Sequence, residues 1–126
     1  MEKLGIYTIK STSTSTTPFV IELDISGTGV GIGTIGDLIV AGVNTSFNSY
    51  VKYHNFTGVG TADGSAFSHS SCVVYEASNI SGTTVSIDFI KNTVDSPYAI
   101  EVTITPGSST STTWSVYYRD ESFETI

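Results

Sequence analysis

The side chains that most readily suggest chemistry in this sequence are two histidines, His54 and His69, and a carboxylate, Asp63. If sheet pairing brought them together, they could ligate a transition metal or activate a serine hydroxyl. A metal site takes three or four ligands at a definite spacing, and these residues follow no such spacing. The Gly-x-Ser-x-Gly turn that marks many serine nucleophiles is also absent from the sequence. We therefore expect no catalytic residue, no metal site and no cofactor, and we predict that the chain is not an enzyme.

A glycine-rich segment, Ser26–Gly36, reads SGTGVGIGTIG and contains a Gly-x-Gly-x-x-Gly pattern. In dinucleotide-binding proteins this pattern opens a helix whose N-terminal amides hold a pyrophosphate. The residues that follow here, Asp37–Val40, favour a strand instead. The segment is therefore predicted to be a bent excursion between two strands. Its alternating glycines would let the backbone lie close against a partner, so Gly29, Gly31 and Gly33 are candidate contact residues.

Paired carboxylates could serve as the acid and base of a glycoside hydrolase. Glu22 and Asp24 lie two residues apart and share one face of a predicted strand, opposite its apolar face. Asp120, Glu121 and Glu124 lie beyond the last apolar residues of the final predicted strand. Neither group has the spacing of an EF-hand calcium loop. We interpret both groups as solvated surface charge.

Four tyrosines form two pairs on predicted strands. Tyr50 and Tyr53 would lie on opposite faces of their strand, and so would the adjacent Tyr117 and Tyr118. At least one tyrosine of each pair must therefore point away from the main core, unless a second sheet or chain covers it. Because tyrosine is common at interfaces and on sugar-binding surfaces, all four are candidate interaction residues.

Alternation of apolar and polar residues with a period of two extends through most of the chain, and helical periodicity is missing. About eight strands are expected, separated by turn residues and by a longer loop over Thr57–Ser65. This predicts an all-β, single-domain antiparallel β-sandwich over residues 1–126, jelly-roll-like, with an immunoglobulin-like fold as runner-up. Residues 1–18 could form an extended N-terminal arm. The expected strands are Leu4–Ile9, Phe19–Ser26, Asp37–Val43, Phe47–Thr57, Phe67–Ala77, Val85–Ile90, Tyr98–Thr105 and Trp114–Arg119.

Composition excludes several functional classes. The 126 residues include only 5 basic and 12 acidic side chains, a net charge of −7, so the chain cannot neutralise many phosphates and nucleic-acid binding is not expected. No apolar stretch is long enough to span a membrane. The start MEKLGIYTIK has no apolar signal core, so export through a signal peptide is not expected. The single cysteine, Cys72, permits no internal disulfide and is predicted to be a small buried side chain.

The leaderless start, the TSTSTT tract, the GTGVGIGTIG segment and the closing strand TTWSVYYRDE resemble small virion proteins of tailed bacteriophages. These are capsid decoration (cement) proteins and the β-rich head domains of fibres. The resemblance implies a non-enzymatic virion structural protein, assembled in the host cytoplasm, that binds the outer surface of a phage head and stabilises it. The implied partners are copies of the same chain in a homotrimer and the major capsid protein or another virion protein.

Two other functions remain open from the sequence. The first is the receptor-binding tip of a tail fibre, although fibres are usually long and carry an N-terminal attachment part. The second is a carbohydrate-binding module, which would usually be exported and fused to a catalytic domain. A surface rich in serine and threonine, which make up 38 of the 126 residues, offers many hydrogen-bonding groups at low entropic cost. Such a surface suits a chain that packs at high copy number against copies of itself or another shell.

Overall fold

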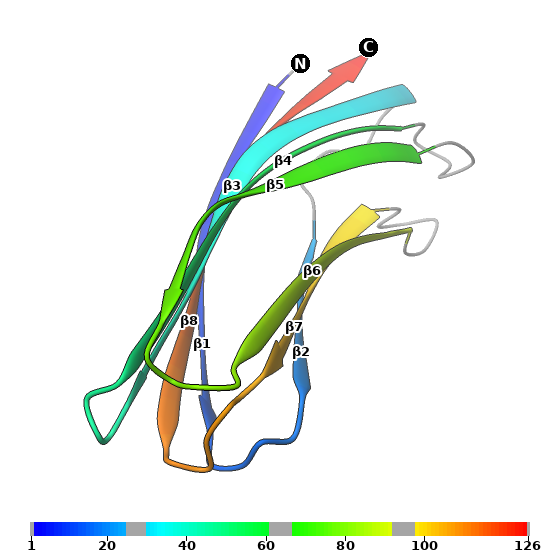
Figure 1. Ribbon diagram of the computed structural model, residues 1–126. Helices are drawn as coiled ribbons and strands as arrows, with labels where there is room; N and C mark the ends of the chain where they lie inside the picture. Colours follow the sequence, from blue (N-terminus) through cyan, green and yellow to red (C-terminus); the bar gives the residue numbers. More distant parts are fainter. Residues whose placement is uncertain (1, 25–29, 61–66, 92–97, 126) are drawn as a thin grey trace.

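The structure, a computed structural model, describes residues 2–24, 30–60, 67–91 and 98–125. Eight β-strands and no helix occur in these residues (Figure 1). The strands are β1 (Glu2–Ser13), β2 (Phe19–Asp24), β3 (Val30–Asn44), β4 (Ser49–Gly60), β5 (Phe67–Ser78), β6 (Thr84–Lys91), β7 (Tyr98–Thr105) and β8 (Thr112–Thr125).

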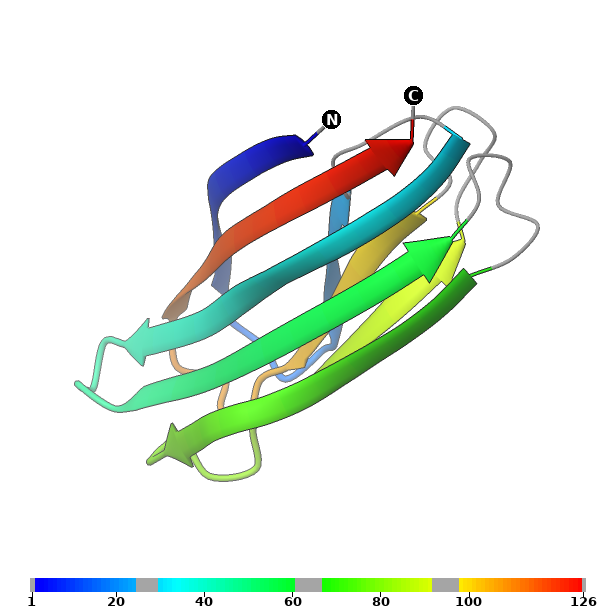
Figure 2. The ribbon, with the colours of Figure 1, turned by 90° about the horizontal axis from the view of Figure 1, so that it is seen from above.

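The strands form two antiparallel sheets that pack face to face. The large sheet has the order β1-β8-β3-β4-β5, and the small sheet has the order β2-β7-β6. Seen from above, the large sheet lies over the small one, and its long strands run in nearly the same direction as β6 and β7 (Figure 2). The predicted all-β sandwich of eight strands is therefore confirmed.

The connectivity follows a jelly roll in its outer part. β1 pairs with β8 and β2 pairs with β7, so the first two strands pair with the last two in reverse order. The middle of the chain differs, because β3, β4 and β5 follow one another as a meander within the large sheet, and β6 pairs with β7. The end strands of the two sheets face each other: β1 lies over β2 at one side of the sandwich, and β5 lies over β6 at the other (Figure 1).

The core lies between the sheets and is built by alternate residues of each strand. The large sheet contributes an aromatic cluster in which Tyr50 meets Trp114 edge to face, with ring centroids 6.0 Å apart, and Phe56 stacks on Tyr118 at 6.1 Å. The small sheet contributes aliphatic side chains. The buried hydrophobic residues are Ile21, Leu23, Leu38, Val40, Tyr50, Phe56, Ile80, Val85, Ile100, Val102, Ile104, Trp114, Val116 and Tyr118.

Several sequence-based strand boundaries are wrong. Phe47, expected to open a strand, lies in the connection between β3 and β4. The predicted glycine-rich excursion is strand from Val30 onward, between β4 and β8, because backbone hydrogen bonds on both sides hold a central strand without help from side chains. Residues 58–60, expected in a loop, continue β4. Residues 120–125, expected beyond the last strand, continue β8. The possible arm over residues 1–18 is strand over Glu2–Ser13, paired with β8 throughout its length.

Candidate binding face

The two tyrosine pairs divide between the inside and the outside of the sandwich, as the alternation requires. Tyr50 and Tyr118 point inward and are each 2% exposed. Tyr53 and Tyr117 point outward from the large sheet, and Tyr117 is 45% exposed. Tyr50 and Tyr118, which the sequence could not separate from their neighbours, are thus core residues in this chain, and only Tyr53 and Tyr117 are accessible to a partner.

Strand register places the outward tyrosines in one row across the large sheet. Tyr75 of β5 lies opposite Tyr53 of β4, Tyr53 lies opposite Ile39 of β3, and Ile39 lies opposite Tyr117 of β8. Because neighbouring strands are about 4.8 Å apart, these four residues span about 14 Å. We call Tyr75, Tyr53, Ile39 and Tyr117 the tyrosine row. Its two outer members are the more exposed, with Tyr75 at 58% and Tyr117 at 45%.

A polar network lines one side of the tyrosine row. The Tyr53 hydroxyl donates a hydrogen bond of 3.1 Å to Asp37 Oδ2, and Arg119 Nη2 donates one of 2.8 Å to the same oxygen. The hydrogen bond to Asp37 raises the pKa of Tyr53 above its usual value, and desolvation adds to this effect. Asp37 therefore fixes one ring of the row and one guanidinium beside it, and its charge is balanced by Arg119.

Small and aliphatic side chains line the other side of the row. Val51 lies opposite Ala77 and Ala41, and Ala41 lies opposite Ser115. Farther along the same face of β3, Ile35 and Val43 are 47% and 55% exposed. These residues add apolar area to the outer face of the large sheet at both ends.

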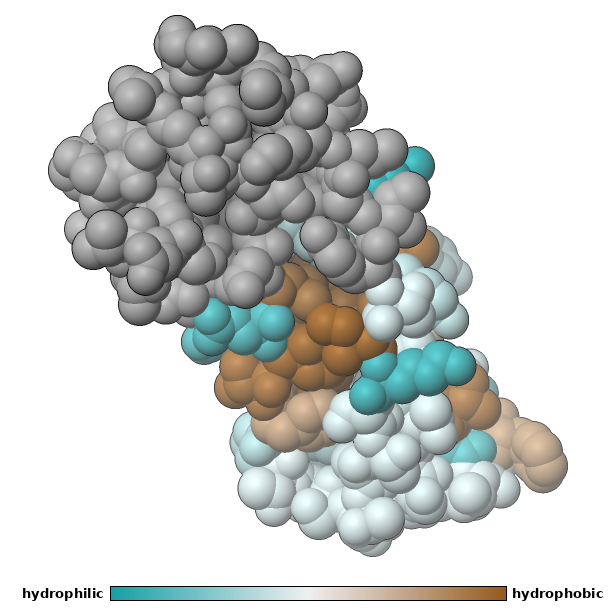
Figure 3. All heavy atoms as spheres, turned by 180° about the vertical axis from the view of Figure 1, so that it is seen from behind, coloured by the Kyte–Doolittle hydropathy of each residue, from teal (hydrophilic) through white to brown (hydrophobic). Residues whose placement is uncertain are grey.

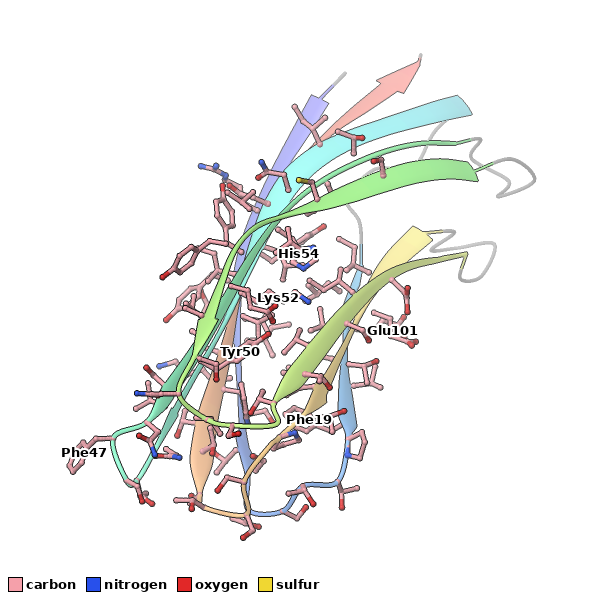
Figure 4. All side chains as sticks on the ribbon, in the orientation of Figure 1. Phe19, Phe47, Tyr50, Lys52, His54 and Glu101 are labelled. Atoms are coloured by element: carbon pink, nitrogen blue, oxygen red, sulfur yellow. The ribbon has the colours of Figure 1, made fainter. Side chains whose placement is uncertain are left out.

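The outer face of the small sheet has the opposite character. Glu101 of β7 lies directly opposite Glu22 of β2 on one side and Asp88 of β6 on the other, so three carboxylates form a row. Figure 4 shows Glu101 on the side of the small sheet that faces away from the large sheet. Like charges at opposed positions destabilise a sheet slightly, and the row makes this face repel anionic surfaces. The apolar and acidic surfaces are thus separated onto the two outer faces.

Polar side chains also lie between the sheets, near the side formed by β5 and β6 (Figure 4). Lys52 Nζ donates a hydrogen bond of 2.5 Å to the Val85 carbonyl and lies 3.9 Å from Glu76 Oε2. The hydroxyl of Tyr50 donates to the same carboxylate oxygen. Burial, followed by the hydrogen bond to Glu76, raises the pKa of Tyr50 far above its usual value. The charges of Lys52 and Glu76 thus face each other, and the three side chains cover that side of the core.

His54 lies next to this cluster but takes no part in it. Its side chain is 5% exposed, and neither ring nitrogen has a hydrogen-bond partner among the described residues. Burial lowers the pKa of His54 below the usual 6.5, and the positive charge of Lys52 lowers it further, whereas Glu76 opposes the shift. The folded protein therefore holds this histidine in its neutral form.

We predict that the free energy of unfolding falls as the pH drops below 6.5. The unfolded chain binds a proton on His54 near that pH, but the folded chain does so only at lower pH, so stability present above 6.5 is lost on acidification. One such proton costs up to about 1.4 kcal/mol per pH unit between the two pKa values. Urea titrations of wild type and His54→Leu at pH 7.5 and 5.0 measure this effect. The variant should lose less stability than wild type, and equal losses would contradict the assignment to His54.

The remaining residues singled out in the sequence do not converge on a site. His69 lies opposite Gly58, whereas His54 lies opposite Val73, so strand pairing keeps the two histidines about four residues, or about 13 Å, apart. Asp63 lies outside the described residues. Cys72, predicted to be buried, is exposed because it lies opposite Asn55 on the outer face of the large sheet. In the described part of the chain no three His, Cys, Asp or Glu side chains gather as a metal site would require.

The candidate glycines lie in different surroundings. Gly33 is inside β3, paired with Val59 of β4, and Gly31 lies where the register between β3 and β8 shifts. Gly29 lies outside the described residues. Sequence reasoning missed Ile39 and Tyr75, which complete the tyrosine row. Their alternation places them on an outward face, but only the register brings them beside Tyr53 and Tyr117.

The described residues contain no helix, and therefore no helix that is long and apolar enough to cross a membrane. No known protein-family description matches the chain, and comparison with curated protein sequences gives no significant match. Among solved structures, the tailspike protein of Acinetobacter phage vB_ApiP_P1 is similar, with a TM-score of 0.46 and 18% sequence identity. The alignment covers 88% of this chain and 21% of the tailspike chain, so this chain spans about a fifth of the tailspike's length. A likeness this remote assigns no function to the chain.

Proposed function

We propose that the chain is a non-enzymatic structural protein of a virion and that it attaches to a protein partner through the outer face of the large sheet. The observation that carries this proposal is the tyrosine row: four cross-strand neighbours that place two half-exposed tyrosines, Tyr75 and Tyr117, on one face. Aromatic residues of this kind are enriched in interfaces because they bury a large area while ordering few torsions.

The character of the face supports protein binding. Charged residues are depleted at the centre of protein interfaces, and the charges beside the row, Asp37 and Arg119, neutralise each other. The small sheet instead displays its row of carboxylates, which favours a solvent-facing orientation for that side. We propose the capsid-decoration role on this basis: the large sheet contacts the major capsid protein or another virion protein, and the acidic face points outward.

A receptor-binding fibre tip or a carbohydrate-binding module is the alternative, and one observation favours it. Tyr53, Asp37 and Arg119 form a hydrogen-bonded group at the edge of the row. Aromatic faces beside fixed polar groups are also what a sugar-binding surface requires, because the rings stack on the sugar and the polar groups bond its hydroxyls.

The proposal predicts that Tyr75→Ala and Tyr117→Ala weaken attachment to virions that lack this chain. Each substitution should lower affinity by about 30-fold if the residue lies at the centre of the interface. Both side chains are half-exposed, so stability should change little. Val20→Ala is the matched control, because Val20 is 53% exposed on the outer face of the small sheet. Affinity is measured as the free concentration of labelled chain at which the particles are half-saturated.

Three results would decide between the alternatives. Saturable binding to particles that is lost in the tyrosine variants but not in Val20→Ala supports the structural role. Binding to a glycan array that the same substitutions abolish, without binding to particles, supports the fibre-tip or carbohydrate-binding alternative. Equal binding by wild type and both tyrosine variants contradicts the use of this face.

A further inference from the structure

The hairpin between β3 and β4 is held in one conformation by its own hydrogen bonds. Asn44 N–H donates to the Asn48 carbonyl (2.9 Å), and Phe47 N–H donates to the Asn44 carbonyl (3.1 Å). The side-chain oxygen of Asn44 accepts hydrogen bonds from the N–H groups of Ser46 and Asn48. Thr45 N–H donates to the Ser111 carbonyl of the β7–β8 connection. These hydrogen bonds therefore fix the backbone conformation at the tip of the hairpin.

Phe47 occupies the position in this hairpin that usually requires glycine or asparagine. Its φ is 63°, and it is the last residue of the Asn44–Phe47 turn and the left-handed residue of a three-residue hairpin loop. A bulky residue is strained in this region. The side chain is also 92% exposed, so no contact within the chain offsets the strain. Figure 4 shows Phe47 projecting from the tip, away from both sheets. The loop thus presents an apolar ring to whatever lies outside the chain.

The surroundings of Phe47 favour a protein partner. Its neighbours in the hairpin are uncharged, as the sequence NTSFNS shows, so no cation is present there to attract a phosphate or an anionic lipid. A single apolar anchor surrounded by neutral polar groups is the arrangement of an interface hot spot.

The same chain offers an apolar surface that could receive this ring. β1 and β2 are end strands of their sheets on the same side of the sandwich. Ile9 of β1 and Phe19 of β2 pack against the core there and remain partly exposed. Figure 3, which views the molecule from this side, shows hydrophobic atoms gathered in the middle of the surface. The opposite side, between β5 and β6, is instead closed by Lys52 and its hydrogen bond to Val85.

We propose that Phe47 of one copy docks against the apolar side between β1 and β2 of a second copy, next to Ile9 and Phe19. The anchor and the acceptor lie on different parts of the chain, so the contact either forms twice across a two-fold axis or repeats head to tail from copy to copy. The contact does not use the tyrosine row, so it can hold even if the tyrosine row binds nothing.

Sedimentation velocity of the purified chain tests this proposal without any other partner. We expect wild type to associate at micromolar concentration and Phe47→Asn to shift the association constant by about 30-fold or more toward monomer. Asparagine tolerates the positive φ, so the variant should melt a few degrees higher than wild type, which separates loss of the contact from misfolding. Val20→Ala, another exposed apolar position, is the control and should associate like wild type. A monomeric wild type, or unchanged association of Phe47→Asn, overturns the proposal.

Mixing two variants identifies the acceptor. Ile9→Ser should also be monomeric while keeping an intact Phe47, and its folding is verified by circular dichroism. Because Phe47→Asn keeps an intact acceptor, an equimolar mixture of the two variants should form a one-to-one heterodimer. If the mixture stays monomeric, or if Ile9→Ser associates like wild type, the acceptor is not the side between β1 and β2. Should Ile9→Ser fail to fold, Phe19→Ser replaces it in the same mixture.

Discussion

Replacing Trp114 with alanine is expected to lower the free energy of unfolding by about 3–5 kcal/mol, the usual cost of removing a fully buried tryptophan. Trp114 has no exposed surface, packs edge to face with Tyr50, and donates a hydrogen bond of 2.9 Å from its indole nitrogen to Ser13 Oγ. Because Ser13 belongs to β1 and Trp114 to β8, the side chain also links the first and last strands of the large sheet.

Urea unfolding followed by circular dichroism measures this loss, and two smaller changes divide it into parts. Ser13→Ala leaves the buried indole N–H without its partner, which should cost about 1–3 kcal/mol. Trp114→Phe removes the hydrogen bond and part of the ring, and should fall between Ser13→Ala and Trp114→Ala. A loss below about 1.5 kcal/mol for Trp114→Ala would contradict the placement of this side chain in the core.

Substituting alanine for Gly42 should destabilise the protein by about 1–3 kcal/mol, although the change adds only one methyl group. Gly42 of β3 lies opposite Trp114 of β8 and Tyr50 of β4. A Cβ at this position would lie 2.5 Å from Trp114 Cζ3 and 2.6 Å from Cε3. Neither atom can retreat easily, since the ring is rigid and enclosed by the core. The same denaturation experiment measures the effect.

A double variant tests whether the clash is the cause. Phenylalanine at position 114 has a smaller ring, so Gly42→Ala should cost less in the Trp114→Phe background than in wild type. The two substitutions are in contact, and a coupling of about 0.5–3 kcal/mol between them is expected. Additive costs would mean that Gly42 is needed for a reason other than the space occupied by the indole.

The strands were predictable because each covers a core with one face only. The alternation in YAIEVTIT places Ile100, Val102 and Ile104 inward, and the predicted strand Tyr98–Thr105 is β7 with the same bounds. Prediction from this alternation fails where the residues have no side chain whose polarity indicates burial. Glycines 31, 33 and 36 carry no side chain, so the central strand β3 looked like a loop at its start.

The candidate binding face was predictable only in part. Alternation shows that Tyr50 and Tyr53 point opposite ways, but which of them enters the core depends on the side on which the small sheet packs. The tyrosine row depends on strand order and register, which join β5, β4, β3 and β8 across the chain. The hairpin at Phe47 could not be predicted for a different reason. The segment NTSFNS has no glycine at the position where the hairpin needs a positive φ, so it lacks the usual signal of such a turn. Cys72 was assigned to the core because the sequence does not show that its strand pairs it with Asn55 on the outer face.

Hydroxyl-radical footprinting of the chain, free and bound to virions, tests most directly whether the outer face of the large sheet is the contact surface. Oxidation of each residue is read by mass spectrometry. We predict that Tyr75 and Tyr117 become protected on binding, that Val20 on the small sheet stays equally reactive, and that buried Tyr118 is unreactive in both states. If Tyr75 and Tyr117 are oxidised equally in the bound and free chain while Val20 becomes protected, the protein binds through its other face and the account is wrong.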